Sequence, residues 1–197
     1  MQDTLIFIQA STGTGPRPYP MNAHCKVPHA VTGKDIYTSV YVYQRMKAAV
    51  VTSVVDGVTQ TFRPREADLK VLCNEPVVAG RVSAQDILRH EPLGAGAKLH
   101  DYVRRAPHIR TVVRLLGNHT LTDPALIFET LQRFAKLPED IKKTHKFGPN
   151  VCHLGQNIEV FTPEALAYCE ERAGDPASCR RTSFNEHVTS LMPAAAP

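Results

Sequence analysis

The sequence lacks any apolar run long enough to cross a membrane. A spanning helix takes about 20 consecutive apolar residues, whereas the longest candidates among these 197 residues, TLIFIQA and AAVVTSVV, have the length of one strand. The sequence also lacks a basic segment before its first apolar run, as a secretory signal would have, and an arginine before Arg17, as a mitochondrial presequence would have. We therefore expect no membrane span.

An even, regularly spaced set of cysteines is also missing. The chain has five: Cys25, Cys73, Cys152, Cys169 and Cys179. An odd, irregular set favours reduced thiols and an intracellular, reducing compartment, whether cytoplasm or organelle. The sequon at Asn118 would matter only on the secretory route, so we expect it to have no role.

A strong excess of either charge is absent as well. The chain carries 23 basic and 19 acidic residues, a net charge of +4, far below the excess of a dedicated nucleic-acid binder. Its 43% hydrophobic and 21% charged residues are typical of a globular protein.

What the sequence does contain predicts strands first and helices second. Apolar and alternating runs predict strands at 4–10, 36–43, 48–55, 58–62, 68–73 and 76–82, with Asp56-Gly57 as a two-residue hairpin turn. Helical spacing predicts helices at 84–90, 98–105, 108–117, 122–137 and 162–174, with a short turn at 138–145. Asp123 and Thr162, each followed by proline, are expected to begin two of these helices.

This order of elements favours an α+β fold. We expect a mostly antiparallel sheet of about five strands within residues 1–91, followed by a helical part at 97–197. The glycine-containing segment 92–97 is the expected joint, although the two parts could form one continuous domain.

Two short histidine- and cysteine-containing segments form a candidate zinc site. One holds His24, Cys25 and His29, and the other holds His145, Cys152 and His153. Imidazole and thiolate are the ligands that zinc prefers, and four complete a structural site. Neither segment has a CxxC or HxxxH pattern, so polar loop residues without a cofactor are the favoured interpretation. A catalytic cysteine, Cys25 or Cys152, is weaker still, because neither lies in a recognisable signature.

The glycine-containing loop STGTGP after the first strand does not fit a phosphate-binding P-loop. Such loops run directly into a helix and continue with Lys-Ser or Lys-Thr. Here Gly15 is followed by prolines at 16, 18 and 20. We interpret the loop as a turn and an extended connector.

A basic cluster and a tyrosine row form a second candidate surface. Arg110 and Arg114 would share one helix face, close to Arg104 and Arg105. Tyrosines at alternating positions of the expected strand at 36–43 would share one face; they are Tyr37, Tyr41 and Tyr43. Arginines bind phosphates or carboxylates, and tyrosines stack on bases.

The function that these patterns favour is non-enzymatic. With no recognisable catalytic signature and only mild basicity, we expect a structural or accessory subunit of a larger intracellular assembly, such as a respiratory complex, an organellar ribosome or a viral particle, with protein partners. The alternatives are an RNA-contacting module that uses the arginines and tyrosines, and a protein stabilised by zinc at the cysteine and histidine segments.

Overall fold

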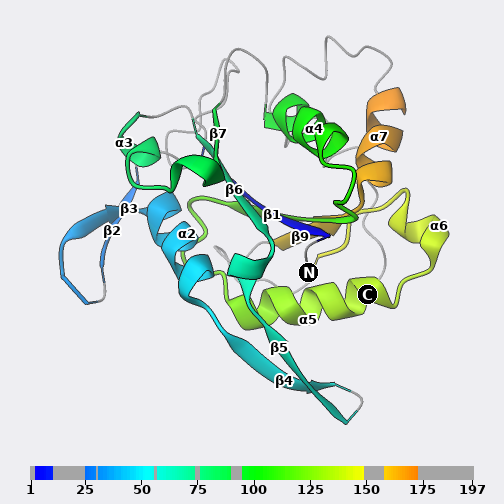
Figure 1. The fold of residues 1–197 in the computed structure, drawn as a ribbon, viewed down its shortest axis with the longest axis horizontal. Helices are drawn as coiled ribbons and strands as arrows, with labels where there is room; N and C mark the ends of the chain where they lie inside the picture. The colour runs from blue at the N-terminus through cyan, green and yellow to red at the C-terminus, as the bar shows by residue number, and fades with distance from the viewer. Residues whose placement is uncertain are drawn as a thin grey trace.

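A five-stranded sheet in the order β7-β6-β1-β8-β9 forms the centre of the fold (Figure 1). The computed structural model describes residues 3–10, 25–29, 31–55, 57–73, 76–89, 95–148 and 158–172. The strands of the sheet are β1 (Thr4–Gln9), β6 (Asp68–Cys73), β7 (Ile87–Arg89), β8 (Thr111–Leu116) and β9 (Ile158–Phe161). The first four are mutually parallel, and β9 alone runs antiparallel to β8.

Helices cover both faces of this sheet. They are α2 (Thr38–Ala48), α3 (Pro76–Ala79), α4 (Ala95–Arg105), α5 (Pro124–Ala135), α6 (Glu139–Lys142) and α7 (Pro163–Arg172). Ile6 and Ile8 of β1 face a core that includes residues of α2 and α5, whereas Leu5 and Phe7 face a core that includes residues of α4 and α7. All six residues of β1 are buried, as expected for a central parallel strand covered on both faces.

Two small hairpins lie outside the central sheet. One pairs β2 (Lys26–Pro28) with β3 (Asp35–Tyr37), and the other pairs β4 (Val51–Val55) with β5 (Val58–Phe62). The expected hairpin is confirmed on its described residues, because Val55 pairs with Val58 and Gly57 has a φ of 78°; Asp56 itself lies outside the described residues. Two short 3-10 turns complete the elements: η1 (Pro64–Glu66) and η2 (Ala84–Asp86).

The predicted fold class is wrong. The structure is an α/β/α arrangement with a mainly parallel sheet, in place of an antiparallel sheet followed by a helical half. Strands from both sides of the expected joint at 92–97 enter the same sheet: β6 and β7 precede it, and β8 and β9 follow it.

Four local predictions fail with it. The segment 108–117, predicted as a helix, contains strand β8. Helices cover both faces of the sheet, so the neighbouring residues Val112 and Val113 are both buried. The sequence of this strand therefore lacks the alternation of apolar and polar residues that marks a half-exposed strand. The segment 36–43, predicted as a strand, becomes helix α2 after Tyr37. The segments 76–82 and 84–90 form α3 and then η2 followed by β7.

The helices with strong end signals are confirmed. Asp123 accepts a hydrogen bond from the Ala125 N–H at 2.9 Å at the start of α5. The Thr162 hydroxyl accepts one from Ala165 N–H at 3.1 Å at the start of α7. Over the described ranges, no helix has both the length and the apolar character that crossing a bilayer requires.

Candidate functional site

The order of the parallel strands reverses between β1 and β8. From β1 the chain passes to β6 and then β7 on one side of it, and only afterwards to β8 on the other side. Open parallel sheets bind ligands outside the carboxyl ends of their strands at such a switch point. The two strand ends are held together here, because Gly117 N–H donates to the Gln9 carbonyl at 2.8 Å.

Helix α2 borders this switch point. Figure 1 shows its start beside α3, the helix that follows the carboxyl end of β6. The residue before the helix, Tyr37, provides no side-chain cap. The next two residues, Thr38 and Ser39, are 2% and 0% exposed, and their hydroxyl oxygens have no hydrogen-bond partner. The end of α2 that carries a partial positive charge therefore also carries two unused hydroxyl groups.

The loop that follows β8 borders the switch point from the other side. It starts at Gly117 and ends at Asp123, where α5 begins. The Asn118 Oδ1 and Thr122 Oγ1 atoms are buried without a partner. The loop also lies against α2, because Arg45 Nη1 donates to the Thr120 carbonyl at 3.1 Å.

These four side chains, which we call the switch-point site, are Thr38, Ser39, Asn118 and Thr122. Among the described residues, they hold all the buried side-chain oxygen and nitrogen atoms without a partner. An unsatisfied buried polar group costs about 1–3 kcal/mol, so native proteins keep few of them. Ordered water or a bound molecule satisfies such groups in native proteins, so these four side chains are candidates for a binding site.

A buried ionic cluster lies on the sheet face that α4 and α7 cover. Arg114 of β8 donates through Nη1 to Glu159 of β9, and its Nε and Nη2 donate to Gln9 Oε1 at 3.2 and 2.8 Å. Lys146 Nζ donates to the other Glu159 oxygen at 3.1 Å. The cluster joins three neighbouring strands next to the switch point.

The charges of this cluster support one another. Burial lowers the pKa of Arg114, and the Glu159 carboxylate opposes this change. For Glu159, burial acts to raise the pKa, but the charges of Arg114 and Lys146 outweigh it, so the pKa of this carboxyl lies below its usual value. Both partners of the buried pair are therefore ionised near neutral pH.

A second polar cluster joins α2 to η2. Tyr43 donates its hydroxyl to Asp86 Oδ2 at 2.6 Å, and Lys47 Nζ contacts the same oxygen at 2.9 Å. The hydrogen bond to Asp86 is the main cause that raises the pKa of Lys47, and burial opposes it. This cluster fixes the position of α2 against the segment that precedes β7.

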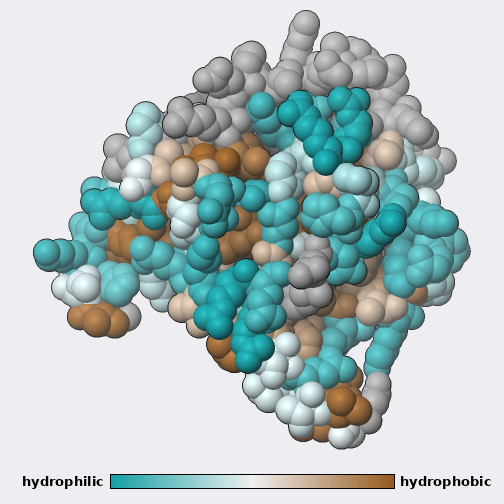
Figure 2. Space-filling view, in the orientation of Figure 1, coloured by the Kyte–Doolittle hydropathy of each residue, from teal (hydrophilic) through white to brown (hydrophobic). Residues whose placement is uncertain are grey.

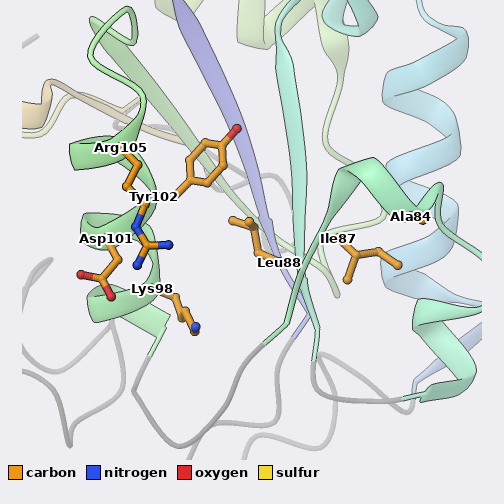
Figure 3. Close-up of a pocket in the computed structure, with 7 residues that line it drawn as sticks. All are labelled: Ala84, Ile87, Leu88, Lys98, Asp101, Tyr102 and Arg105. Carbon is orange, nitrogen blue, oxygen red and sulfur yellow. The ribbon is translucent and has the colours of Figure 1, made fainter.

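A cavity of about 420 Å³ lies at the edge of the sheet, between β7 and α4. Figure 3 shows its lining residues Ala84, Ile87, Leu88, Lys98, Asp101, Tyr102 and Arg105. Tyr102 donates its hydroxyl to Asp68, and burial followed by this bond raises the pKa of the tyrosine. A second cavity of about 290 Å³ lies near the amino end of β8, beside Arg110.

Half of the predicted zinc ligands lie outside the described residues: His24, Cys152 and His153. Cys25 precedes β2, and the Nδ1 atom of His29 accepts from Val31 N–H at 3.2 Å in the turn after β2. His145 Nδ1 lies 2.7 Å from the Thr144 hydroxyl. In the described ranges, no three His, Cys, Asp or Glu side chains gather as metal ligands. The zinc site stays a prediction.

The predicted arginine cluster does not lie on one helix face. Arg104 and Arg105 end helix α4, and Arg104 lies 4.0 Å from Asp101. Arg110 precedes β8 and Arg114 lies within it, where it is buried in the ionic cluster.

The tyrosines do not share a strand face either. Tyr37 ends β3, where Lys26 Nζ lies 5.0 Å from the centre of its ring. Tyr41 and Tyr43 lie on helix α2, and Tyr43 is buried. Residues two positions apart share one face of a strand, but on a helix such as α2 they point in different directions.

Comparison with known proteins finds similarity at the level of the fold alone. No protein-family model and no curated protein matches the sequence. A cytidylyltransferase from Leptospira borgpetersenii serovar Hardjo-bovis superposes with a TM-score of 0.59 and 16% identity, covering 94% of this chain and 70% of that one. This chain is similar in fold to a cytidylyltransferase. CMP:2-keto-3-deoxy-manno-octonic acid synthetase in complex with CTP superposes with 14% identity over 98% of this chain and 90% of that one. Its TM-score of 0.47 is too low to support an inference.

This similarity contradicts the expected function. A cytidylyltransferase is an enzyme, and its fold extends over nearly the whole of this chain. The expectation of a non-enzymatic structural or accessory subunit in a multiprotein assembly is therefore wrong, and the RNA-contacting alternative is abandoned with it.

Sequence reasoning missed every member of the switch-point site. Thr38 and Ser39 were assigned to a strand, and Asn118 was considered only as part of a sequon. One usable signal was present: Gly117-Asn118 directly follows the β-branched run TVVRLL, as a loop follows a buried strand. Assigning that run to a helix concealed the signal.

Proposed function

We propose that this chain is a nucleotidyltransferase that binds cytidine triphosphate at the switch-point site. One observation carries the proposal. The described buried polar atoms without a partner lie on two segments, the start of α2 and the loop that follows β8 at the switch point, in a fold that is similar to that of a cytidylyltransferase.

The chemistry of the site suits a nucleotide. The hydroxyl groups of Thr38 and Ser39 can donate to phosphate oxygens, and the positive end of the α2 dipole attracts the same negative charge. The Asn118 amide and the Thr122 hydroxyl offer donors and acceptors, which suits the hydroxyl groups of a ribose or the edge of a base.

The reaction that follows is displacement at the α-phosphorus. An acceptor oxygen forms a bond to this phosphorus while the bond to the bridging oxygen of pyrophosphate breaks, and the acceptor proton passes to solvent. Pyrophosphate leaves with the bonding electron pair. The start of α2 stabilises the negative charge on the phosphate groups throughout this exchange.

Titration calorimetry with CTP tests the proposal. We expect saturable binding that ATP and GTP do not match. Because Ser39→Ala removes a hydrogen bond to a charged group, worth about 1.5–3 kcal/mol, CTP binding should weaken by about 10- to 150-fold. Ser53→Ala, which removes a serine hydroxyl from the remote strand β4, is the matched control and should bind CTP as the natural chain does.

Two results would overturn the proposal. The first is the absence of saturable CTP binding to the natural chain at millimolar nucleotide. The second is CTP binding that Ser39→Ala and Ser53→Ala leave equally unchanged.

A further inference from the structure

The cavity between α4 and β7 is bounded on one side by a single face of α4 (Figure 3). The residues of this helix that line it have the spacing i, i+3, i+4 and i+7, which places them on one face: Lys98, Asp101, Tyr102 and Arg105. Its volume of about 420 Å³ lies within the range typical of sites for small organic molecules. The cavity is therefore large enough to hold a ligand beside this helix face.

Two cationic side chains of this face have no partner. Among the described residues, no hydrogen bond or ion pair involves the side chain of Lys98 or Arg105. Figure 3 shows Arg105 extending along α4 toward Lys98, so the two charged groups lie on the same wall of the cavity. Asp101, the acidic residue of the lining, lies 4.0 Å from Arg104, whose charge opposes it from outside the cavity. The lining therefore offers two positive charges to an anion.

The opposite wall of the cavity is apolar. Ile87 and Leu88 of β7 form it, and both are only partly buried. Because β7 is the outermost strand on this side of the described sheet, no neighbouring strand covers them. Figure 2 shows apolar residues at the surface beside the strongly hydrophilic residues of α4. Partly exposed aliphatic side chains gain free energy when a ligand removes them from water, so this wall favours a ligand with an apolar part.

We propose that this cavity binds a phosphate monoester that carries an apolar group. Near neutral pH such a phosphate has a charge of about −1.5 to −2, which matches two unpaired cations more closely than the single charge of a carboxylate does. The planar guanidinium of Arg105 can donate two parallel hydrogen bonds to phosphate oxygens, and the Lys98 ammonium adds a second positive charge. The apolar group then packs against Ile87 and Leu88.

The expected affinity is modest because solvent reaches both cations. Arg105 is exposed and Lys98 is half-buried, so dissolved salt screens their charges. We expect a dissociation constant on the order of 1 mM for a small monoester, and weaker binding as the salt concentration rises. The inference does not depend on the proposed binding of CTP, because the cavity and the switch-point site have no residue in common.

Amide NMR spectroscopy of the full chain, titrated with phenyl phosphate up to about 20 mM at constant ionic strength, covers the expected constant and locates the site. Saturable chemical-shift changes are expected at Ile87, Leu88 and Tyr102. Inorganic phosphate lacks the apolar group and benzyl alcohol lacks the charge, so each should bind at least about 10-fold more weakly. Lys98→Gln and Arg105→Gln each remove one cation and should weaken the binding of phenyl phosphate by about 10-fold.

Arg65→Gln is the matched control. Arg65 is also exposed and has no ion pair among the described residues, but it belongs to η1 and does not line the cavity, so binding should be unchanged. The inference is overturned if the natural chain shows no saturable change around the cavity, if Arg65→Gln weakens binding as much as Arg105→Gln does, or if inorganic phosphate binds as tightly as phenyl phosphate. Changes confined to the switch-point site would also overturn it, while they would support the proposed nucleotide site.

Discussion

Replacing Thr38 by valine separates binding from stability. The substitution keeps the shape and β-branching of the side chain and exchanges only the hydroxyl for a methyl group. Thr38 is 2% exposed and its Oγ1 atom has no hydrogen-bond partner. We therefore expect Thr38→Val to make the unliganded protein more stable while it weakens the binding of CTP.

The magnitude follows from the unsatisfied hydroxyl. Leaving such a group buried costs about 1–3 kcal/mol, and this penalty disappears when the group becomes apolar. For a chain of this size, each kcal/mol corresponds to about 2–4 °C in Tm. The loss of a hydrogen bond to phosphate should weaken CTP binding by about 10-fold or more.

Thr130→Val is the matched comparison. Thr130 is also 2% exposed, but its hydroxyl donates to the Leu126 carbonyl at 2.6 Å on α5. Removing this satisfied hydrogen bond should lower the free energy of unfolding by about 1 kcal/mol and leave CTP binding unchanged.

Thermal unfolding followed by circular dichroism, together with titration calorimetry, measures both effects. The reasoning is refuted if Thr38→Val lowers Tm as Thr130→Val does, because the Thr38 hydroxyl would then have a partner within the protein. It is also refuted if Thr38→Val raises Tm but binds CTP as tightly as the natural chain.

The other predictions concern stability. Glu159→Gln should destabilise the fold by about 3–5 kcal/mol in urea unfolding, because it removes the carboxylate that balances the buried Arg114 charge; an effect below 1 kcal/mol would contradict this. The pKa of Glu159 is lowered in the folded state. The stability that this carboxylate contributes is therefore fully present above the unfolded carboxyl pKa, near 4.3, and is lost as the pH falls through the folded pKa. The difference in stability between the natural chain and Glu159→Gln should shrink on acidification. Asp123→Ala should cost about 1 kcal/mol in the same assay by removing the cap of α5. Asp140→Ala, at the start of α6 where no side-chain cap bond forms, should cost less.

Local features were predictable from the sequence because they depend on residues close together in the chain. The cap at Asp123, the cap at Thr162 and the turn at Gly57 each involve groups within three residues of one another. Side-chain reach and backbone conformation decide such features, and residue types report both directly.

The strands of the sheet were harder to predict because their partners are distant. Leu5 of β1 pairs with Asp68 on one side and with Val112 on the other. A strand buried on both faces loses the alternation that marks a half-exposed strand, so the run around Val112 matched a helical spacing as well. That one assignment turned a parallel sheet into a predicted helical half and placed Arg114 on a surface instead of in the core.

The sequence by itself determined the β4–β5 hairpin and the starts of α5 and α7, because chemistry within a few residues sets each of them. Only the tertiary structure decided that β1 and β8 lie side by side. The loop after β8 contacts α2 through Arg45, in the last turn of that helix, and four polar side chains of these two segments have buried atoms without a partner. Burial is a property of the assembled layers, so no pattern in the sequence could distinguish Thr38 and Ser39 from hydroxyl groups exposed to water.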